Sequence, residues 1–237
     1  MATLIFRDDP YARRCDATVV SAEPGAIRLD RTVFYPTGGG QPGDTGCLVL
    51  PDGATLAIVD TRKGDGGPDD VVHVPAADGK PLPAPGTVVS AEIDWDRRHR
   101  LMRMHTCLHL LCAVVPGAVT GGQVGDGKGR LDFDVPGAAL DRDDIAAKLN
   151  ELIRAAHPVT PRWITDEELA ARPDLVRTMS VKPPTGHGRV RLLDIADVDL
   201  QPCGGTHVRN TAEIGPVEIG KIENKGKQNR RVTIGFA

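Results

Sequence analysis

The sequence has few aromatic residues, no long apolar run and no strong excess of charge. Aromatic residues are only 3 % of the 237 residues, so the core has to be built from Leu, Val, Ile and Ala. No apolar stretch approaches the roughly 20 residues that a membrane-spanning helix requires. The N-terminus also lacks a basic segment followed by an apolar run, so no signal peptide is predicted. We therefore expect a cytoplasmic protein with no membrane association.

Cysteine is present but not in a disulfide pattern. The chain has five cysteines, an odd number without the regular spacing of a disulfide framework. A reducing compartment favours metal binding over disulfide chemistry for Cys203. The net charge of −3 implies nothing about partners for the chain as a whole. Any contact with RNA would have to be local, because a nucleic-acid-binding domain is commonly basic.

Residues 1–94 are predicted to form strands. Short apolar runs are separated by turn residues such as Pro51-Asp52-Gly53, and short strands at close spacing are typical of a small barrel or sandwich. Residues 78–86 contain so many prolines and glycines that they are predicted to be a loop. The predicted strands occupy residues 18–20, 26–29, 47–50, 55–59, 71–74 and 87–93.

Residues 95–237 are predicted to combine helices with strands. The apolar spacing predicts helices at about 96–114 and 141–156. A shorter helix is predicted at 165–171, where Thr165 and Glu168 have the spacing of a capping box. Because strands and helices do not alternate as βαβ units, we expect an α+β fold with the helices on one face of a mainly antiparallel sheet. Strands are predicted at 129–134, 161–164, 190–195, 217–222 and 231–234.

Two short motifs offer metal ligands. His105 and His109 form an H-x3-H pair in the first helix, and residues four apart lie on one helical face. Cys203 and His207 form a C-x3-H pair with two glycines between them, which suits a tight turn. Either pair alone is a weak signal, since two histidines in a helix are usually packing or surface residues. Together, three imidazoles and one thiolate are a ligand set that suits Zn²⁺.

The role of the ion is left open by these motifs. Four protein ligands are typical of a closed structural zinc site, whereas a catalytic zinc keeps a position open for water or substrate. The H-E-x-x-H motif of metalloproteases is absent from the sequence, and so is the paired spacing of a zinc finger.

Three further segments have both a plain and a functional interpretation. The glycine-rich segments 34–44 and 119–130 can be simple hairpin loops, or their bare backbone can approach a ligand closely. Residues 221–231 gather five basic residues against one acidic residue. Such a run is usually a solvated loop, but it is also what local attraction to phosphate would require. Lys227 and Arg230 are the candidate substrate contacts in it.

Four segments together resemble one family, the freestanding alanyl-tRNA editing proteins of the AlaX type, which are similar to the editing domain of alanyl-tRNA synthetase. The resemblance runs over nearly the whole chain. It is carried by Phe34-Tyr35-Pro36-Thr37-Gly38-Gly39-Gly40-Gln41-Pro42-Gly43-Asp44-Thr45-Gly46, Arg103-Met104-His105-Thr106-Cys107-Leu108-His109-Leu110-Leu111, Cys203-Gly204-Gly205-Thr206-His207 and Gly226-Lys227-Gln228-Asn229-Arg230-Arg231.

The resemblance implies an N-terminal β-barrel at 1–94, carrying the glycine-rich loop, and a C-terminal α+β editing domain at 95–237. It implies ATP-independent hydrolysis of the ester in tRNA(Ala) mischarged with serine, or with glycine, and no protein partner. The residues that match the family motifs would have the following roles. His105, His109, Cys203 and His207 would bind zinc, Thr120 and Gln123 would lie near the amino-acid side chain, and Gly38, Gly39 and Gly40 would face the editing pocket.

Two alternatives remain open at the level of sequence. One is a non-catalytic RNA-binding module whose zinc is structural. The other is an editing enzyme for a different mischarged tRNA, such as Ser-tRNA(Thr), because related editing domains have similar H-x3-H and C-x3-H pairs.

Overall fold

The computed structural model describes residues 2–136, 140–176 and 188–237. The chain divides into two compact units, residues 1–99 and 100–237, and each is described by itself. Helix α2 (Trp95–Val114) begins in the first unit and continues into the second. Within the described ranges, no helix is long and apolar enough to cross a membrane.

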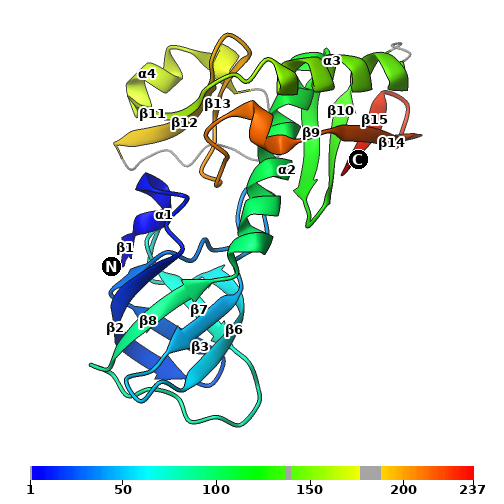
Figure 1. Cartoon of the computed structure of the whole chain (residues 1–237). Coiled ribbons are helices and arrows are strands. Elements are labelled where there is room, and N and C mark those ends of the chain that lie inside the picture. The colour runs from blue at the N-terminus through cyan, green and yellow to red at the C-terminus, as the bar shows by residue number, and fades with distance from the viewer. Residues whose placement is uncertain (1, 137–139, 177–187) are drawn as a thin grey trace. The chain divides into compact units, whose positions relative to one another are not determined.

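The first unit is built around a closed antiparallel barrel, as the sequence predicts (Figure 1). The strand order around the barrel is β2-β3-β7-β6-β5-β8. A short helix, α1 (Ile5–Asp8), and a parallel pair of short strands, β1 (Thr3–Leu4) and β4 (Arg31–Thr32), accompany it. The barrel strands are β2 (Arg14–Glu23), β3 (Ala26–Leu29), β5 (Gly46–Val49), β6 (Thr55–Lys63), β7 (Val71–Pro75) and β8 (Val88–Ile93).

Alternation of buried and exposed residues fills the barrel. In β6, Leu56 and Ile58 are buried while the residues between and beside them are exposed, as the period of two of a strand requires. Phe34 is the one aromatic ring in the main barrel cluster, and the other members are aliphatic. The core therefore consists of the residue types that the composition predicts. Its buried members include Val19, Ile27, Leu29, Leu48, Val89 and Ala91.

The triple-glycine segment forms a tight two-residue turn. The backbone amides of Gly38 and Gln41 each donate to the other residue's carbonyl at 3.0 Å. Gly39 and Gly40, between them, have φ angles of 57° and 79°. Positive φ at both central residues is the geometry of a type I′ turn, which glycine adopts without strain. Tyr35 fixes the turn from one side, since its hydroxyl donates to the Gly38 carbonyl at 2.8 Å.

A buried ion pair joins the loop after this turn to the first turn of α2. Arg98 and Asp44 are completely buried and hydrogen-bonded through both carboxylate oxygens. The Arg98 guanidinium also donates to the carbonyls of Pro10 and Val33, at 3.0 and 2.7 Å. A buried guanidinium is tolerated only when such partners replace its hydration. Asp94 caps the helix, because its carboxylate accepts from the Arg97 amide at 3.0 Å.

The second unit contains two antiparallel sheets and three helical elements that the sequence predicts (Figure 1). One sheet has the strand order β14-β15-β10-β9 and the other has the order β11-β12-β13. The strands are β9 (Ala118–Val124), β10 (Lys128–Asp134), β11 (Val159–Thr165), β12 (Arg189–Ile195), β13 (Asp199–Pro202), β14 (Val217–Asn224) and β15 (Asn229–Phe236). Besides α2, the helices are α3 (Arg142–Arg154), α4 (Asp166–Ala170) and the 3₁₀ turns Pro173–Leu175 and Thr211–Ile214.

Local signals define α3 and α4. Asp141 caps α3 by accepting from the amides of Asp143 and Asp144, which satisfies donors that a helix start leaves free. The predicted capping box at the start of α4 is confirmed, because the Thr165 and Glu168 side chains each accept from the other's backbone amide. Both helices therefore begin where their capping residues lie.

Helix α2 packs closely on the four-stranded sheet. A Cβ atom on Gly129 of β10 would lie 2.7 Å from the Met104 sulfur and 3.3 Å from a Leu108 methyl carbon. A larger residue there would force the Met104 side chain to shift and would disturb the packing of the helix on the strand. The α2 residues Leu101, Met104, Leu108 and Leu111 are buried, as their helical spacing predicts.

His73 is buried in the first unit in its neutral form. Its Nδ1–H donates to the Ile27 carbonyl at 3.1 Å, and its Nε2 accepts from the Thr32 hydroxyl at 2.8 Å. The Thr32 oxygen in turn accepts from the Phe34 amide. Burial lowers the pKa of His73 from 6.5 to about 4, although the hydrogen bond to Ile27 raises it.

We predict that the barrel loses stability as the pH falls from 6.5 to 4. In that interval the unfolded chain binds a proton that the folded barrel excludes, which costs about 3 kcal/mol at pH 4. The measurement is urea unfolding followed by Trp95 fluorescence in a Trp163→Phe background. His73→Gln keeps a donor and an acceptor but does not titrate, so its loss of stability should be smaller by that amount. Equal losses in the two proteins would contradict the prediction.

Candidate metal centre

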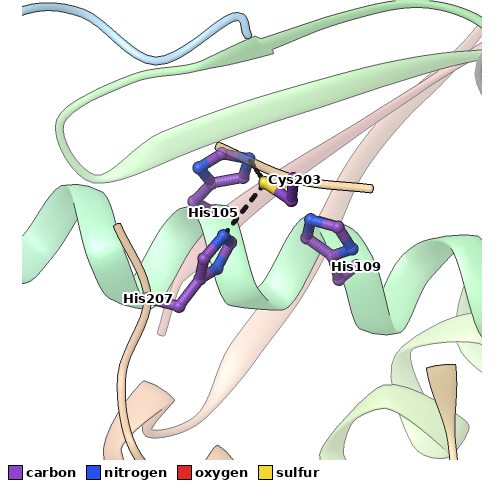
Figure 2. A group of neighbouring side chains, drawn as sticks. All are labelled: His105, His109, Cys203 and His207. Atoms are coloured by element: carbon purple, nitrogen blue, oxygen red, sulfur yellow. Dashed lines mark hydrogen bonds between the residues drawn. The ribbon is translucent and has the colours of Figure 1, made fainter. Parts of the chain in front are cut away.

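Helix α2 supplies two of the four predicted ligands. His105 and His109 lie one turn apart on the same face, with ring centroids 5.5 Å apart (Figure 2). Both are buried, with 6 % and 8 % of their surface exposed. The spacing i, i+4 therefore has the consequence that the sequence predicts: two imidazoles face the same point.

The turn after β13 supplies the other two ligands. Cys203 and His207 flank Gly204-Gly205-Thr206, and the Gly205 amide donates to the Cys203 sulfur at 3.4 Å. A buried arginine on the neighbouring strand holds this turn. Arg191 Nη1 donates to the carbonyls of Cys203 and Gly205, at 2.9 and 3.0 Å.

These two segments, about a hundred residues apart in the chain, meet at one point (Figure 2). The Cys203 sulfur lies 3.2 Å from His207 Nε2 and 3.7 Å from His105 Nε2. The ligand atoms of all four residues lie within 4.8 Å of one another. Neighbouring ligands of a tetrahedral zinc are about 3.3–3.8 Å apart, given its bond lengths to nitrogen and sulfur. The four residues can thus hold a metal ion, and their donor set fits zinc.

The electrostatics of the cluster favour a thiolate. Burial raises the pKa of the Cys203 thiol, but the electrostatic interaction with His105 and hydrogen bonds from His105 and His109 together outweigh it. The net pKa lies well below the ordinary value. Burial lowers the pKa of His207 to about 3 despite the opposing effect of Cys203, so that ring is neutral. A thiolate and a neutral imidazole are the forms that bind a metal.

Two outer contacts hold the histidine rings, and the sequence did not predict either. Asp199 accepts from His109 Nδ1 at 3.1 Å, and the Gln201 amide also donates to it, at 2.7 Å. Thr106 Oγ1 lies 3.2 Å from His207 Nδ1. Asp199 precedes Cys203 by four residues, and metal-binding histidines commonly have a carboxylate partner. That rule could have directed attention to Asp197 and Asp199, but it could not have chosen between them.

Thr120 and Gln123 lie in a separate polar network on the four-stranded sheet. The Thr120 hydroxyl donates to the Asp132 carbonyl at 3.2 Å and accepts from the Asn229 side-chain amide at 2.7 Å. Gln123 pairs with Arg130 in the sheet and accepts from its guanidinium at 3.3 Å. Since side chains alternate along β10, Arg130 lies on the opposite face from Gly129, which contacts α2. The part of Thr120 and Gln123 in substrate recognition stays a prediction.

The basic run forms the hairpin between β14 and β15, and its charges are partly neutralised. Lys221 and Lys225 both pair with Glu223. Arg231 makes a two-point contact with Asp132, at 2.7 and 2.8 Å. Lys227 and Arg230 form no ion pair within the part of the chain that the structure describes. These two cations are therefore the ones available to an anionic partner.

Comparison with known proteins agrees with this geometry. Residues 190–233 match the family model described as the threonyl and alanyl tRNA synthetase second additional domain, and residues 10–97 match that of class II (A) tRNA synthetases. The chain is 38 % identical to the alanyl-tRNA editing protein AlaX-M of Methanosarcina acetivorans, over 98 % of each chain. The AlaX-M protein of Saccharolobus solfataricus is 32 % identical, with the same coverage of both chains.

The chain belongs to the alanyl-tRNA editing protein family. It is also 36 % identical to the alanine–tRNA ligase of Metallosphaera sedula, over 92 % of this chain but only 24 % of the ligase. The family predicted from the four motifs is thereby confirmed. The match at residues 190–233 contains Cys203 and His207, so it includes the turn that carries two of the candidate ligands.

Proposed function

We propose that this protein hydrolyses the ester bond of tRNA(Ala) mischarged with serine, and of tRNA(Ala) mischarged with glycine. The observation that carries the proposal is the convergence of His105, His109, Cys203 and His207 in a chain similar to editing proteins over its full length. In the reaction, water adds to the ester carbonyl and the bond to the terminal ribose oxygen breaks. The products are the free amino acid and tRNA with a free hydroxyl, so no ATP is consumed.

Zinc is the ion that we propose for the centre, held by the three imidazoles and the Cys203 thiolate. When bound, it supplies a positive charge that can polarise the ester carbonyl or a water molecule. The three histidines are buried and Cys203 is half-buried beside them, so the donors are held in place before substrate arrives. Fixed polar groups in such an environment stabilise the charge of a transition state at low reorganisation cost.

The glycine turn of the barrel is the proposed contact for the aminoacyl end. Gly39 and Gly40 are exposed and carry no side chain, so a ligand can reach their backbone amides closely. Tyr35 and the paired amides of Gly38 and Gln41 hold the turn in this shape. We propose that this rigid backbone contacts the substrate.

The proposed function is tested by deacylation of purified substrates. Ser-tRNA(Ala), Gly-tRNA(Ala), Ser-tRNA(Thr) and correct Ala-tRNA(Ala) are each incubated with protein of measured zinc content, before and after chelation. We expect rapid loss of serine from tRNA(Ala), little loss of alanine, and recovery of activity when zinc is restored to the chelated protein.

Other results of this assay identify the alternatives. A folded, zinc-loaded protein that binds tRNA(Ala) but deacylates none of the substrates would be an RNA-binding module with a structural zinc. This alternative is supported by the number of protein ligands, because a zinc ion with four of them is typically structural. Preference for Ser-tRNA(Thr) would reassign the substrate and leave the hydrolase in place.

Selectivity requires that correct Ala-tRNA(Ala) survives. A hydroxyl that bonds the substrate's serine hydroxyl would be left without that partner by alanine, and such sites discriminate strongly. We propose that Thr120 provides this hydroxyl. A threonine oxygen has two acceptor positions, and Asn229 uses one of them.

We predict that Thr120→Val lowers Ser-tRNA(Ala) hydrolysis about tenfold, the value of roughly one hydrogen bond, while tRNA binding changes little. Thr120→Ser keeps the hydroxyl and is the matched control. Rates of deacylation and dissociation constants for tRNA are measured on both variants. Equal losses of hydrolysis and binding, or no loss of either, would remove Thr120 from this role.

The hairpin cations Lys227 and Arg230 are proposed to contact the phosphate backbone of tRNA. We predict that replacing both with alanine weakens tRNA binding and makes it less dependent on salt, because fewer counterions are released. The slope of log affinity against log salt should fall by about 1 to 2. Lys148→Ala, which removes an ion-paired cation from α3, should leave the slope unchanged. An unchanged slope in the double variant would exclude the hairpin from the interface.

A further inference from the structure

Two of the three histidines in the candidate metal centre, His109 and His207, make an outer contact through Nδ1. An imidazole has two nitrogens, and in its neutral form one carries hydrogen while the other is free to bind a metal. A hydrogen-bond partner on one nitrogen therefore selects the other as the ligand. We propose that Asp199 and Thr106 are positioning residues that fix His109 and His207 as Nε2 ligands. The inference rests on the zinc part of the proposed function.

Asp199 fixes the His109 ring. Its side chain is completely buried, and Oδ2 accepts from both His109 Nδ1 and Gln201 Nε2. A carboxylate only accepts hydrogen bonds, so the hydrogen of His109 lies on Nδ1. In the neutral ring, which is the form that binds a metal, Nε2 is therefore the nitrogen left for the ion. Gln201, which lies on the same strand as Asp199, holds the carboxylate in place through this hydrogen bond.

Thr106 fixes the His207 ring in the same way, but with a neutral hydroxyl as the acceptor. The Thr106 hydroxyl has one hydrogen, and it donates this to the Met102 carbonyl at 2.9 Å. Its contact with His207 Nδ1 at 3.2 Å is therefore one in which the histidine donates. His207 Nε2, the remaining nitrogen, is the atom that lies 3.2 Å from the Cys203 sulfur.

Asp199 also contributes charge. Zn²⁺ bound to one thiolate and three neutral imidazoles has a net charge of +1, and a buried charge is costly unless it is compensated. The Asp199 carboxylate brings this total to zero beside His109. Asp199 thus has two effects that can be separated, since asparagine keeps an accepting oxygen but removes the charge.

The experiment measures the zinc dissociation constant of the tRNA-free protein by competition with a chromogenic chelator. We expect Asp199→Ala to bind zinc about 10–100-fold more weakly, as for lost outer contacts of other metal sites, with Asp199→Asn between it and the original protein. Thr106→Val should also weaken binding, and Thr106→Ser should restore it. Asp194→Asn is the matched control, because it removes an aspartate of the same sheet that pairs with Arg162 instead.

A second readout separates positioning from general stability. Absorption spectra of the Co²⁺-substituted proteins report the ligand geometry, and unfolding of the metal-free proteins reports their stability. If Asp199→Ala does not fold, the Thr106 pair decides. Zinc constants within about twofold of the original for Asp199→Ala and Thr106→Val would overturn the proposal, as would failure of the original protein to bind zinc. If the original protein binds zinc and the variants bind it more weakly, but the original protein deacylates no substrate, only the proposed function is contradicted.

Discussion

The burial of three imidazoles beside a thiol is the constraint on which the second unit depends. Polar groups removed from water are costly unless hydrogen bonds or charges replace their hydration. Each group of the cluster that loses water therefore needs a partner from elsewhere in the chain. The Gly205 amide donates to the sulfur, Asp199 accepts from His109, and Thr106 accepts from His207. The site is consequently a connected polar network, and its parts depend on one another.

Two segments of the chain, one helix and one turn, hold the groups of this network in position. The helix that bears His105 and His109 packs so closely on β10 that a Cβ atom at position 129 would clash with the Met104 side chain. The turn that bears Cys203 and His207 is held by the Arg191 guanidinium, which donates hydrogen bonds to two carbonyls of the turn. Because packing and hydrogen bonds already hold both segments, an ion that bound there would not have to gather its ligands. A site held in advance in this way binds its ligand at a smaller entropic cost.

The sequence predicted several features that depend on neighbours in the chain. The spacing of His105 and His109 was sufficient to place both on one helical face, and Thr165 with Glu168 was sufficient to start α4. It could not predict that Asp199 would meet His109 ninety residues away, because that contact depends on the register of β13 in its sheet. The contact between the Thr120 hydroxyl and Asn229 could not be predicted either, since the two residues lie on strands far apart in the chain. The two motifs were sufficient to name the four candidate ligands, whereas the partners of those ligands became visible only in the fold.

The buried pair of Arg98 and Asp44 has a consequence for how the ligand-bearing helix forms. Starting a helix is the unfavourable step, since several residues are fixed for a single hydrogen bond, whereas each later residue adds a bond of its own. Here Asp94 and Arg98 fix the first turn of α2 by contacts made entirely inside the first unit. These contacts supply the first turn that an isolated helix would have to form at a cost. His105 lies about two turns further along the same helix, so the segment that carries two candidate ligands begins at a turn that barrel residues stabilise.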